Sequence, residues 1–218
     1  MESRADKQAR AGRILELLGP LYPGRRPLLV FENPFELLVS TVLAAQCTDA
    51  AVNLVTPALF ARYPDPASLA AAPLPDLEAL IHRTGFFRAK AQHIKALSRQ
   101  LLERYNGEIP RTMEALTALP GVGRKTASVV LSSCYGIPAI IVDTHFSRLS
   151  RRLELASSDR PGLIEAQIAG LLPESDWTAA SHLLNRHGRA LCHARKPGCA
   201  ACPVRGLCPV RGLCLGSL

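Results

Sequence analysis

Residues 111–134 read RTMEALTALPGVGRKTASVVLSSC, and this stretch predicts two short helices joined by a tight turn. Apolar residues recur at helical spacing on both sides of the turn, which spans Leu119-Pro120-Gly121-Val122-Gly123. Two glycines permit positive φ angles and a close approach of other atoms to the backbone. The second helix begins with free amide groups, which together with the helix dipole favour a bound phosphate. We therefore interpret this hairpin as a phosphate-binding element rather than an ordinary connection between packed helices.

Two basic residues, Arg124 and Lys125, follow the turn directly. Lys125 stands at the positive end of the second helix, where a cation is disfavoured. That position favours the neutral amine that a Schiff-base mechanism requires. Without further context, a lysine that only contacts phosphate is the simpler interpretation.

A carboxylate follows an apolar run at residues 140–146, IIVDTHF. The run places Asp143 at the edge of the core, half-buried, where a carboxylate can stabilise a developing cation and relay protons. An aspartate in front of a helix is also a common N-cap, here for the segment that starts at Thr144. Different atoms of the same neighbourhood can fill both roles.

The chain has seven cysteines, and five of them fall after residue 190. An intracellular chain is not expected to keep such a cluster as disulfides, so the cluster suggests a metal. Four thiolates in a compact series suit a [4Fe–4S] cluster, although spacing alone leaves a zinc site open. The x6-x2-x5 series consists of Cys192, Cys199, Cys202 and Cys208, whereas Cys214 repeats the last spacing and is left out. Cys47 and Cys134 are isolated and are expected to be small buried hydrophobic residues.

Composition restricts the possible classes of protein. The 218 residues are 48% hydrophobic and 5% aromatic, which suits one or two domains with an aliphatic core. No apolar window is long enough to span a membrane, and the charged N-terminus lacks the apolar core of a secretory signal. We therefore expect an intracellular protein. The net charge is 26 − 18 = +8, and residues 183–218 carry five arginines, one lysine and no acid. Such a basic block suits a nucleic acid as partner, and on charge alone a solvated basic tail explains it equally well.

The periodicity is helical nearly throughout, which predicts an all-α fold. Helices are expected over residues 34–45 and 89–105, with Gly107 able to end the second. A short helix is expected after Asp76, and Asp176 is expected to cap a helix over 177–187. Only residues 137–142, IPAIIV, look extended, and Pro138 makes them a poor ladder strand.

Together, LPGVGRKTA at 119–127, VDTH at 142–145 and the cysteine series resemble the endonuclease III family of helix-hairpin-helix DNA glycosylases. The resemblance extends from about Pro34 to Cys208 and includes PFELLVSTVLAAQCTD at 34–49 and HGRALCHARKPGC at 187–199. It implies a two-lobed helical fold. One lobe of six helices would span 29–145 and carry the hairpin at about 111–134, and residues 1–28 with 146–218 would form the iron–sulfur lobe.

The resemblance also implies a bifunctional glycosylase and abasic-site lyase that acts on oxidised pyrimidines such as thymine glycol. Lys125 would attack C1′ of the deoxyribose, and β-elimination from the resulting Schiff base would cut the strand 3′ to the lesion. Asp143 would assist base departure and proton transfer. The four cysteines of the series would hold a [4Fe–4S] cluster that carries a charge of about −2.

The remaining implied roles concern DNA. Gln46 matches a glutamine that fills the gap left by the flipped nucleotide, and Phe86 falls where the family often has a leucine wedge. The hairpin, Leu119 to Arg124, would bind the DNA backbone. It could also hold an alkali cation through carbonyls that include those of Leu119 and Val122. We expect a monomer in the cytoplasm or nucleoid of a prokaryote, with double-stranded DNA that contains damaged bases or abasic sites as its partner.

Some positions depart from the family pattern, and they bear on specificity more than on chemistry. Adenine and mismatch glycosylases of the same superfamily are disfavoured, because they typically lack the lysine and the adenine type has an extra C-terminal domain. A non-catalytic DNA-binding iron–sulfur paralogue remains an alternative. The departures are Ala44, Cys47, Phe86, Phe87, Arg88, Asn185, Arg186 and the tail beyond Cys208.

Overall fold

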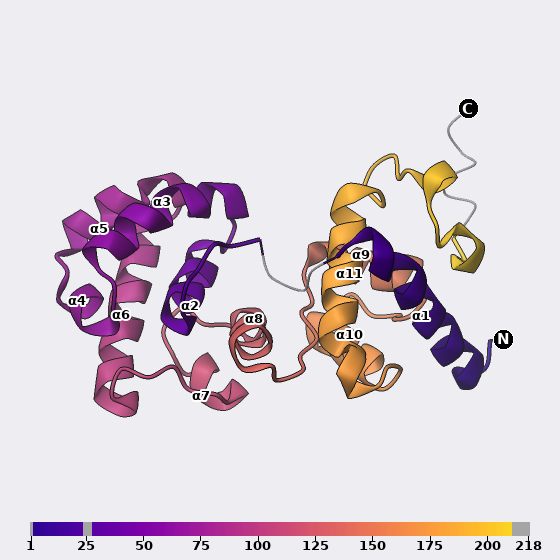
Figure 1. Cartoon of the computed structure of the whole chain (residues 1–218), viewed down its shortest axis with the longest axis horizontal. Coiled ribbons are helices and arrows are strands. Elements are labelled where there is room, and N and C mark those ends of the chain that lie inside the picture. Colours follow the sequence, from indigo (N-terminus) through magenta and orange to yellow (C-terminus); the bar gives the residue numbers. More distant parts are fainter. Residues whose placement is uncertain (1, 24–27, 211–218) are drawn as a thin grey trace. The chain divides into compact units, whose positions relative to one another are not determined.

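The computed structural model describes residues 2–23 and 28–210, so Cys214 lies outside the described residues. The chain forms two compact units, one of residues 26–137 and one of residues 1–25 with 138–218 (Figure 1). The described part of the first unit contains seven α-helices, where the resemblance implied six over 29–145. The division into a six-helix lobe and an iron–sulfur lobe with those boundaries stays a prediction.

The unit of residues 26–137, here called the hairpin unit, is built around the long helix α6 (Phe87–Tyr105). Ile94, Leu97 and Leu101 lie on one face of α6 and are fully buried. Helix α6 packs against α2, α4 and α5, and α2 also packs against α8. The other helices of the unit are α2 (Pro34–Leu43), α3 (Asp49–Arg62), α4 (Pro66–Ala71), α5 (Leu74–Ile81), η2 (His82–Thr84), α7 (Met113–Thr117) and α8 (Arg124–Tyr135).

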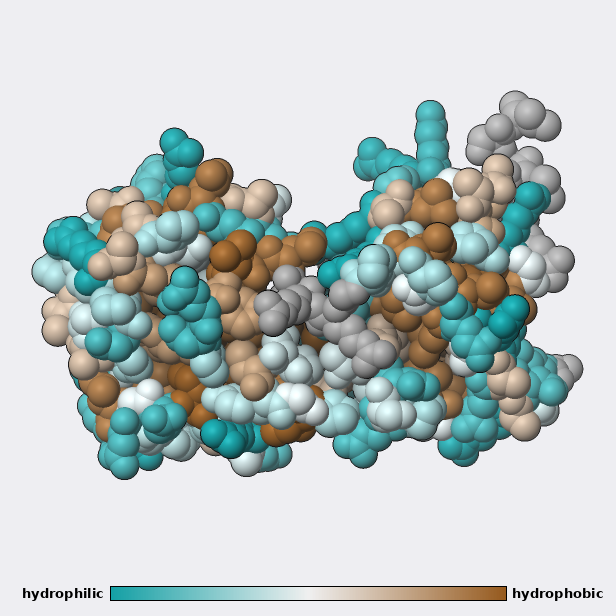
Figure 2. Space-filling model, viewed as in Figure 1, coloured by the Kyte–Doolittle hydropathy of each residue, from teal (hydrophilic) through white to brown (hydrophobic). Residues whose placement is uncertain are grey.

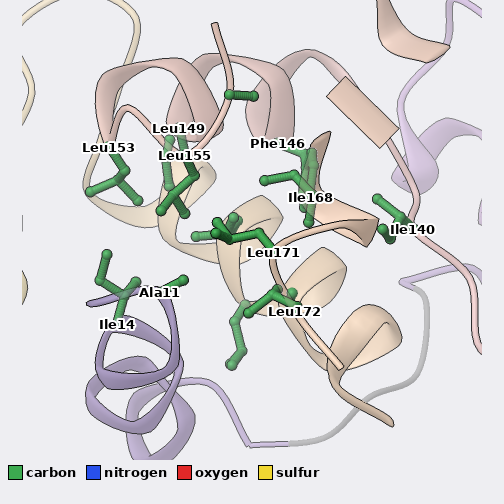
Figure 3. Close-up of a cluster of buried hydrophobic side chains, with 14 of the residues drawn as sticks. Ala11, Ile14, Ile140, Phe146, Leu149, Leu153, Leu155, Ile168, Leu171 and Leu172 are labelled. Atoms are coloured by element: carbon green, nitrogen blue, oxygen red, sulfur yellow. The ribbon is translucent and has the colours of Figure 1, made fainter. Parts of the chain in front are cut away.

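The second unit, here called the cysteine-loop unit, joins the first helix of the chain to the last ones. Helix α1 (Arg4–Leu18) packs against α11 (Trp177–Ala190), although the two are far apart in sequence (Figure 1). Figure 3 shows their shared core, in which Ile14 of α1 faces aliphatic side chains of α9 and α10. The other helices are η1 (Gly19–Leu21), α9 (Thr144–Arg152), α10 (Pro161–Ala169), η3 (Glu174–Asp176), η4 (Cys199–Ala201) and η5 (Arg205–Leu207).

The prediction of an all-helical protein is confirmed, since the described residues contain helices and no strand. Residues 137–142 connect the two units along the chain without forming a ladder. Their backbone amides bond instead to hydroxyls on α11. The amide of Ala139 donates to Thr178 Oγ1 at 3.3 Å, and the amide of Ile141 donates to Ser181 Oγ at 2.9 Å. Side chains thus satisfy donors that a neighbouring strand would otherwise have to satisfy.

Three expected helix ends differ in detail. Asp176 stands at the N-cap position of α11, but its side chain makes no capping bond and its backbone is already helical. The helix expected after Asp76 begins two residues earlier, at Leu74, because Pro73 and the proline at 75 suit the helix start. Helix α6 ends at Asn106, which adopts the left-handed conformation, and Gly107 follows with φ 83°.

In the view of Figure 2, hydrophobic residues reach the surface of each unit in separate groups between hydrophilic ones. Over residues 2–23 and 28–210, no helix combines the length and hydropathy that crossing a membrane requires.

Candidate functional site

The hairpin is formed by α7, a turn and α8, as the sequence predicts. Gly121 has φ +76°, a conformation that favours glycine. Gly123 does not, since its φ of −93° and ψ of 172° are ordinary extended values. Of the two glycines that permit a positive φ, only Gly121 adopts one. This residue is the N-cap of α8 and supplies no side-chain cap, which leaves amides of the first turn without the usual side-chain partner.

Packing against α6 holds the turn in place. A Cβ at Gly121 would lie 2.9 Å from His93 Cβ of α6, so α6 and the turn approach each other closely. The side chains of Leu119 and Val122 are 2% and 6% exposed. These two residues anchor the hairpin in the core, and only their backbone can meet a ligand. The carbonyl of Leu119 already accepts from the amide of Val122 at 3.1 Å.

The basic residues of the hairpin lie on its outer side. Arg124 and Lys125 are the first two residues of α8, and both are exposed. The Lys125 amine therefore stands in the helix turn whose amides have no side-chain cap. A phosphate bound by those amides would lie next to this amine.

Besides the helix C-cap Asn106, two exposed residues of the described hairpin unit have a left-handed backbone. Gln46, between α2 and α3, has φ 53°, and Phe86, just before α6, has φ 46°. Left-handed conformations of such residues cost about 1–3 kcal/mol and persist where the surroundings enforce them, often at functional sites. Phe86 is 70% exposed and Gln46 is exposed, so neither side chain is held by burial.

Asp143 is half-buried at the start of α9, and each of its carboxylate oxygens accepts a hydrogen bond. Oδ1 accepts from the amide of Phe146 at 2.7 Å, which is the N-cap interaction considered above. Oδ2 accepts from the side-chain amide of Asn185 on α11. The cap is thus real and uses one oxygen, while the other oxygen is oriented by a separate helix.

All four cysteines of the x6-x2-x5 series line one pocket of the cysteine-loop unit, beside Leu149, Leu153 and Val204. Burial raises the pKa of the Cys202 and Cys208 thiols, and bound iron would offset this because a metal ligand thiol is deprotonated.

Donors surround the sulfur atoms of this pocket. Arg152 Nη1 donates to Cys192 Sγ at 3.2 Å, and His187 Nε2 lies 3.4 Å from Cys202 Sγ. His187 is buried, which lowers its pKa, and its Nδ1 lies 3.0 Å from the Tyr22 hydroxyl. Hydrogen bonds to cysteine sulfur and a cationic surrounding suit an anionic iron–sulfur cluster.

Within residues 2–23 and 28–210, no group of three His, Cys, Asp or Glu side chains is placed so that it could hold a metal ion.

Comparisons with known proteins agree with this geometry. The family model of the HhH-GPD superfamily base excision DNA repair proteins matches residues 39–174, and that of the iron–sulfur binding domain of endonuclease III matches residues 192–208. Endonuclease III of Synechocystis is 49% identical over 95% of this chain and 95% of its own length. The chain belongs to the endonuclease III family. The family's iron–sulfur domain confirms the prediction of a [4Fe–4S] cluster over zinc.

Further endonuclease III relatives extend the match. Endonuclease III of Bacillus subtilis is 45% identical over 88% of this chain and 89% of its own. A solved structure of a trapped endonuclease III–DNA covalent intermediate has a TM-score of 0.88 and 42% identity. The match covers 93% of this chain and 95% of the chain in that structure.

Sequence reasoning missed several residues of this endonuclease III site. Asn185 was noted only as a departure, and its bond to Asp143 could not be inferred without knowing that α9 and α11 pack together. The sequence alone assigns no role to Arg152 or His187, whose contacts with cysteine sulfur depend on how the unit packs. One signal was available for His187, since it follows an apolar stretch and faces the same side of the helix as Leu183 and Leu184.

Proposed function

We propose that the chain is a bifunctional DNA glycosylase and abasic-site lyase of base excision repair that acts on oxidised pyrimidines of the thymine glycol type. The observation that carries the proposal is the place of Lys125. Its amine is exposed in the first turn of α8, immediately after an N-cap without a capping side chain. A DNA phosphate bound by those amides would bring the adjacent deoxyribose to the amine.

Lys125 is the nucleophile. Its nitrogen lone pair forms a bond to C1′ while the bond from C1′ to the base breaks and its electron pair leaves with the base. Opening of the sugar ring then yields an imine between Lys125 and the deoxyribose. Loss of a proton from C2′ expels the 3′ phosphate, so the strand is cut 3′ to the lesion.

Asp143 stabilises the positive charge that develops on the sugar and relays protons during base departure. Its Oδ1 serves as the N-cap of α9, and the bond from Asn185 orients Oδ2. A carboxylate that is held in this way needs little reorganisation when charge develops. We assign Asp143 as the catalytic carboxylate and Asn185 as its positioning residue.

The DNA-binding residues lie in three turns of the hairpin unit. Gly121, Gly123 and Arg124 bind phosphate at the hairpin, where Leu119 and Val122 anchor the turn and can offer carbonyls to an alkali cation. Gln46 enters the gap left by the flipped nucleotide, and Phe86 stacks as a wedge. Their exposure leaves both side chains free to enter a duplex.

Cys192, Cys199, Cys202 and Cys208 hold the [4Fe–4S] cluster. When bound, the cluster closes the loop and adds about −2 charge, which the surrounding arginines offset. Arg152 and Arg10 supply part of this positive charge, because the first bonds Cys192 and the second lies near Cys208.

The partner is double-stranded DNA with damaged bases or abasic sites, and the protein acts as a monomer. The relatives named above are bacterial. We accordingly place it inside a prokaryotic cell, in the cytoplasm or nucleoid.

Borohydride trapping tests the function. Duplexes that contain thymine glycol or an abasic site are incubated with the iron-loaded protein and borohydride, which reduces an imine to a stable amine. The chain has lysines at 7, 90, 95, 125 and 196, so few amines compete. We expect covalent adducts with both duplexes, their loss in Lys125→Ala, and their retention in Lys95→Ala.

The outcomes separate the alternatives. An adduct with abasic DNA alone would keep the lyase chemistry and remove thymine glycol as the substrate. No adduct with either duplex, while DNA binding persists, would instead support a non-catalytic DNA-binding iron–sulfur protein.

A further inference from the structure

Lys90 of α6 is a buried lysine in a helix whose other lysine, Lys95, is partly exposed. Its side chain is 5% exposed, and burial lowers its pKa. The ammonium nitrogen donates to two backbone carbonyls, that of Leu43 at 2.8 Å and that of Thr84 at 2.7 Å. A buried ammonium is costly unless it is hydrogen-bonded, so these two bonds hold its position.

The two carbonyls lie at the bases of two separate loops. Leu43 is the last residue of α2, and Gln46 follows it by three residues. Thr84 is the last residue of η2, and Phe86 follows it by two. Cys47 of the first loop is also near enough to interact electrostatically with the ammonium. One nitrogen atom thus joins the loop of Gln46 to the loop of Phe86.

In each of these two loops, a residue other than glycine adopts the left-handed conformation that glycine usually adopts. Gln46 has φ 53° and Phe86 has φ 46°, and both side chains project into solvent. Exposed side chains cannot enforce these conformations by packing. The constraint has to come from the chain around them, and the bonds of Lys90 fix a carbonyl shortly before each strained residue.

We propose that Lys90 is a positioning residue that fixes these two loops to each other, so that Gln46 and Phe86 enter the duplex together as one preformed wedge. The inference rests on the proposed function, in which these two residues meet the DNA. A wedge that is ordered before binding avoids the entropy cost of ordering two loops in the complex. Lys90 itself touches neither the DNA nor the reacting sugar.

The test compares two lysine variants on one helix. Lys90→Met keeps the length and apolar stem of the side chain and removes both bonds. Lys95→Met is the matched control, because Lys95 also donates to a backbone carbonyl, that of Ala72, which belongs to the connection between α4 and α5. Each variant is assayed for kcat and KM on two abasic substrates, one opposite a base in a full duplex and one bulged out without an opposing nucleotide.

The bulged substrate needs no wedge, because no gap opens opposite a nucleotide that has no partner. We expect Lys90→Met to lose at least about tenfold in kcat/KM on the paired substrate and less than about twofold on the bulged one. A 2-aminopurine opposite the lesion reports insertion, and its fluorescence change on binding is expected to disappear in Lys90→Met only. Lys95→Met is expected to match the unmodified protein on both substrates.

Equal losses on both substrates would overturn the proposal, because they would assign Lys90 to general stability or chemistry. Unchanged activity with an intact 2-aminopurine signal would overturn it as well. If Lys90→Met does not fold, Lys90→Gln replaces it. That side chain is one atom shorter and still offers amide donors, so an intermediate and selective loss on the paired substrate is expected. Inactivity of the unmodified protein on both substrates would instead refute the proposed function.

Discussion

The hairpin and the cysteine loop are both turns held in shape for a task, but they are held by different means. The side chains of Leu119 and Val122 are buried within the hairpin unit. Gly121 packs so closely against His93 that a Cβ there would clash. The cysteine loop depends instead on arginines from other elements. The comparison teaches that apolar side chains and close packing hold one turn, whereas charged hydrogen bonds from a distant helix hold the other.

The arginines act on backbone carbonyls of the loop and of the helix before it. Arg148 Nη2 donates to the carbonyls of Gly188 at 2.8 Å and Cys192 at 2.9 Å. Arg152 donates to the carbonyls of His193 at 2.7 Å and Ala194 at 2.9 Å. These bonds satisfy carbonyls in the last turn of α11 and just beyond its end, where the helix no longer supplies donors. The loop therefore keeps its path through charged bonds that span 40 to 44 positions in the sequence.

The largest difference in behaviour between the cysteine loop and the hairpin is expected when a cluster ligand is removed. In Cys202→Ser we expect the iron content to fall well below the about four atoms per chain of a [4Fe–4S] protein. Without the cluster, the loop loses its central crosslink, and proteases should cleave within 192–210 while the hairpin unit stays resistant. Iron assay and limited proteolysis measure both effects.

Cys134→Ser is the matched control, since Cys134 is a partly buried free cysteine of α8 in the other unit. It should keep its iron and its protease resistance. Equal cleavage of both units in Cys202→Ser would contradict the idea that the hairpin is self-sufficient.

Loss of one arginine should have a smaller effect. Arg152→Met leaves the carbonyls of His193 and Ala194 without their donor, and we expect a loss of about 1–3 kcal/mol in unfolding free energy. Thermal unfolding of the iron-loaded protein measures this. Arg151→Met removes the same charge from an exposed neighbour and should cost less than about 0.5 kcal/mol. If the two variants melt together, net charge rather than the bonds of Arg152 supports the loop.

The smallest change in stability is expected for substitutions in the hairpin. Gly121→Ala places a Cβ at 2.9 Å from His93 in a backbone with φ +76°, which we expect to cost about 1–2 kcal/mol. Gly123→Ala adds a Cβ that meets nothing within 4 Å in an ordinary extended backbone, so it should change stability by less than about 1 kcal/mol. Chemical denaturation of both variants gives the difference, and a larger effect at Gly123 would reverse our assignment of the strained glycine.

The sequence predicts local features well, because its signals for them are local. The helices at 34–45 and 89–105 appear close to their expected bounds, and the hairpin lies where PGVG indicates. Features that depend on two distant segments could not be predicted. Lys90 occupies a position in an otherwise polar-rich helix that gives no hint of burial, and its partners are carbonyls, which no residue type reveals.

The same limit applies to the site. The cysteine spacing predicts the ligand set, but Arg152 can be assigned to Cys192 only once α9 is known to lie beside the loop. Asp143 was correctly expected at a helix start and half-buried, whereas its partner Asn185 comes from a helix about 40 residues later. Residues 137–142 resemble a strand because their periodicity does not show that hydroxyls of α11 will bind their amides.

The construction of one unit from both ends of the chain has a consequence for biosynthesis. The buried face of α1, with Ile14 and Leu18, is made first, but α11, against which the helix packs, ends only at Ala190. At roughly 5–20 residues per second, translation of the intervening segment takes about 10–30 s. The contiguous residues 26–137 can fold on the ribosome during this time. Until α11 is made, the apolar face of α1 stays exposed and can bind a chaperone.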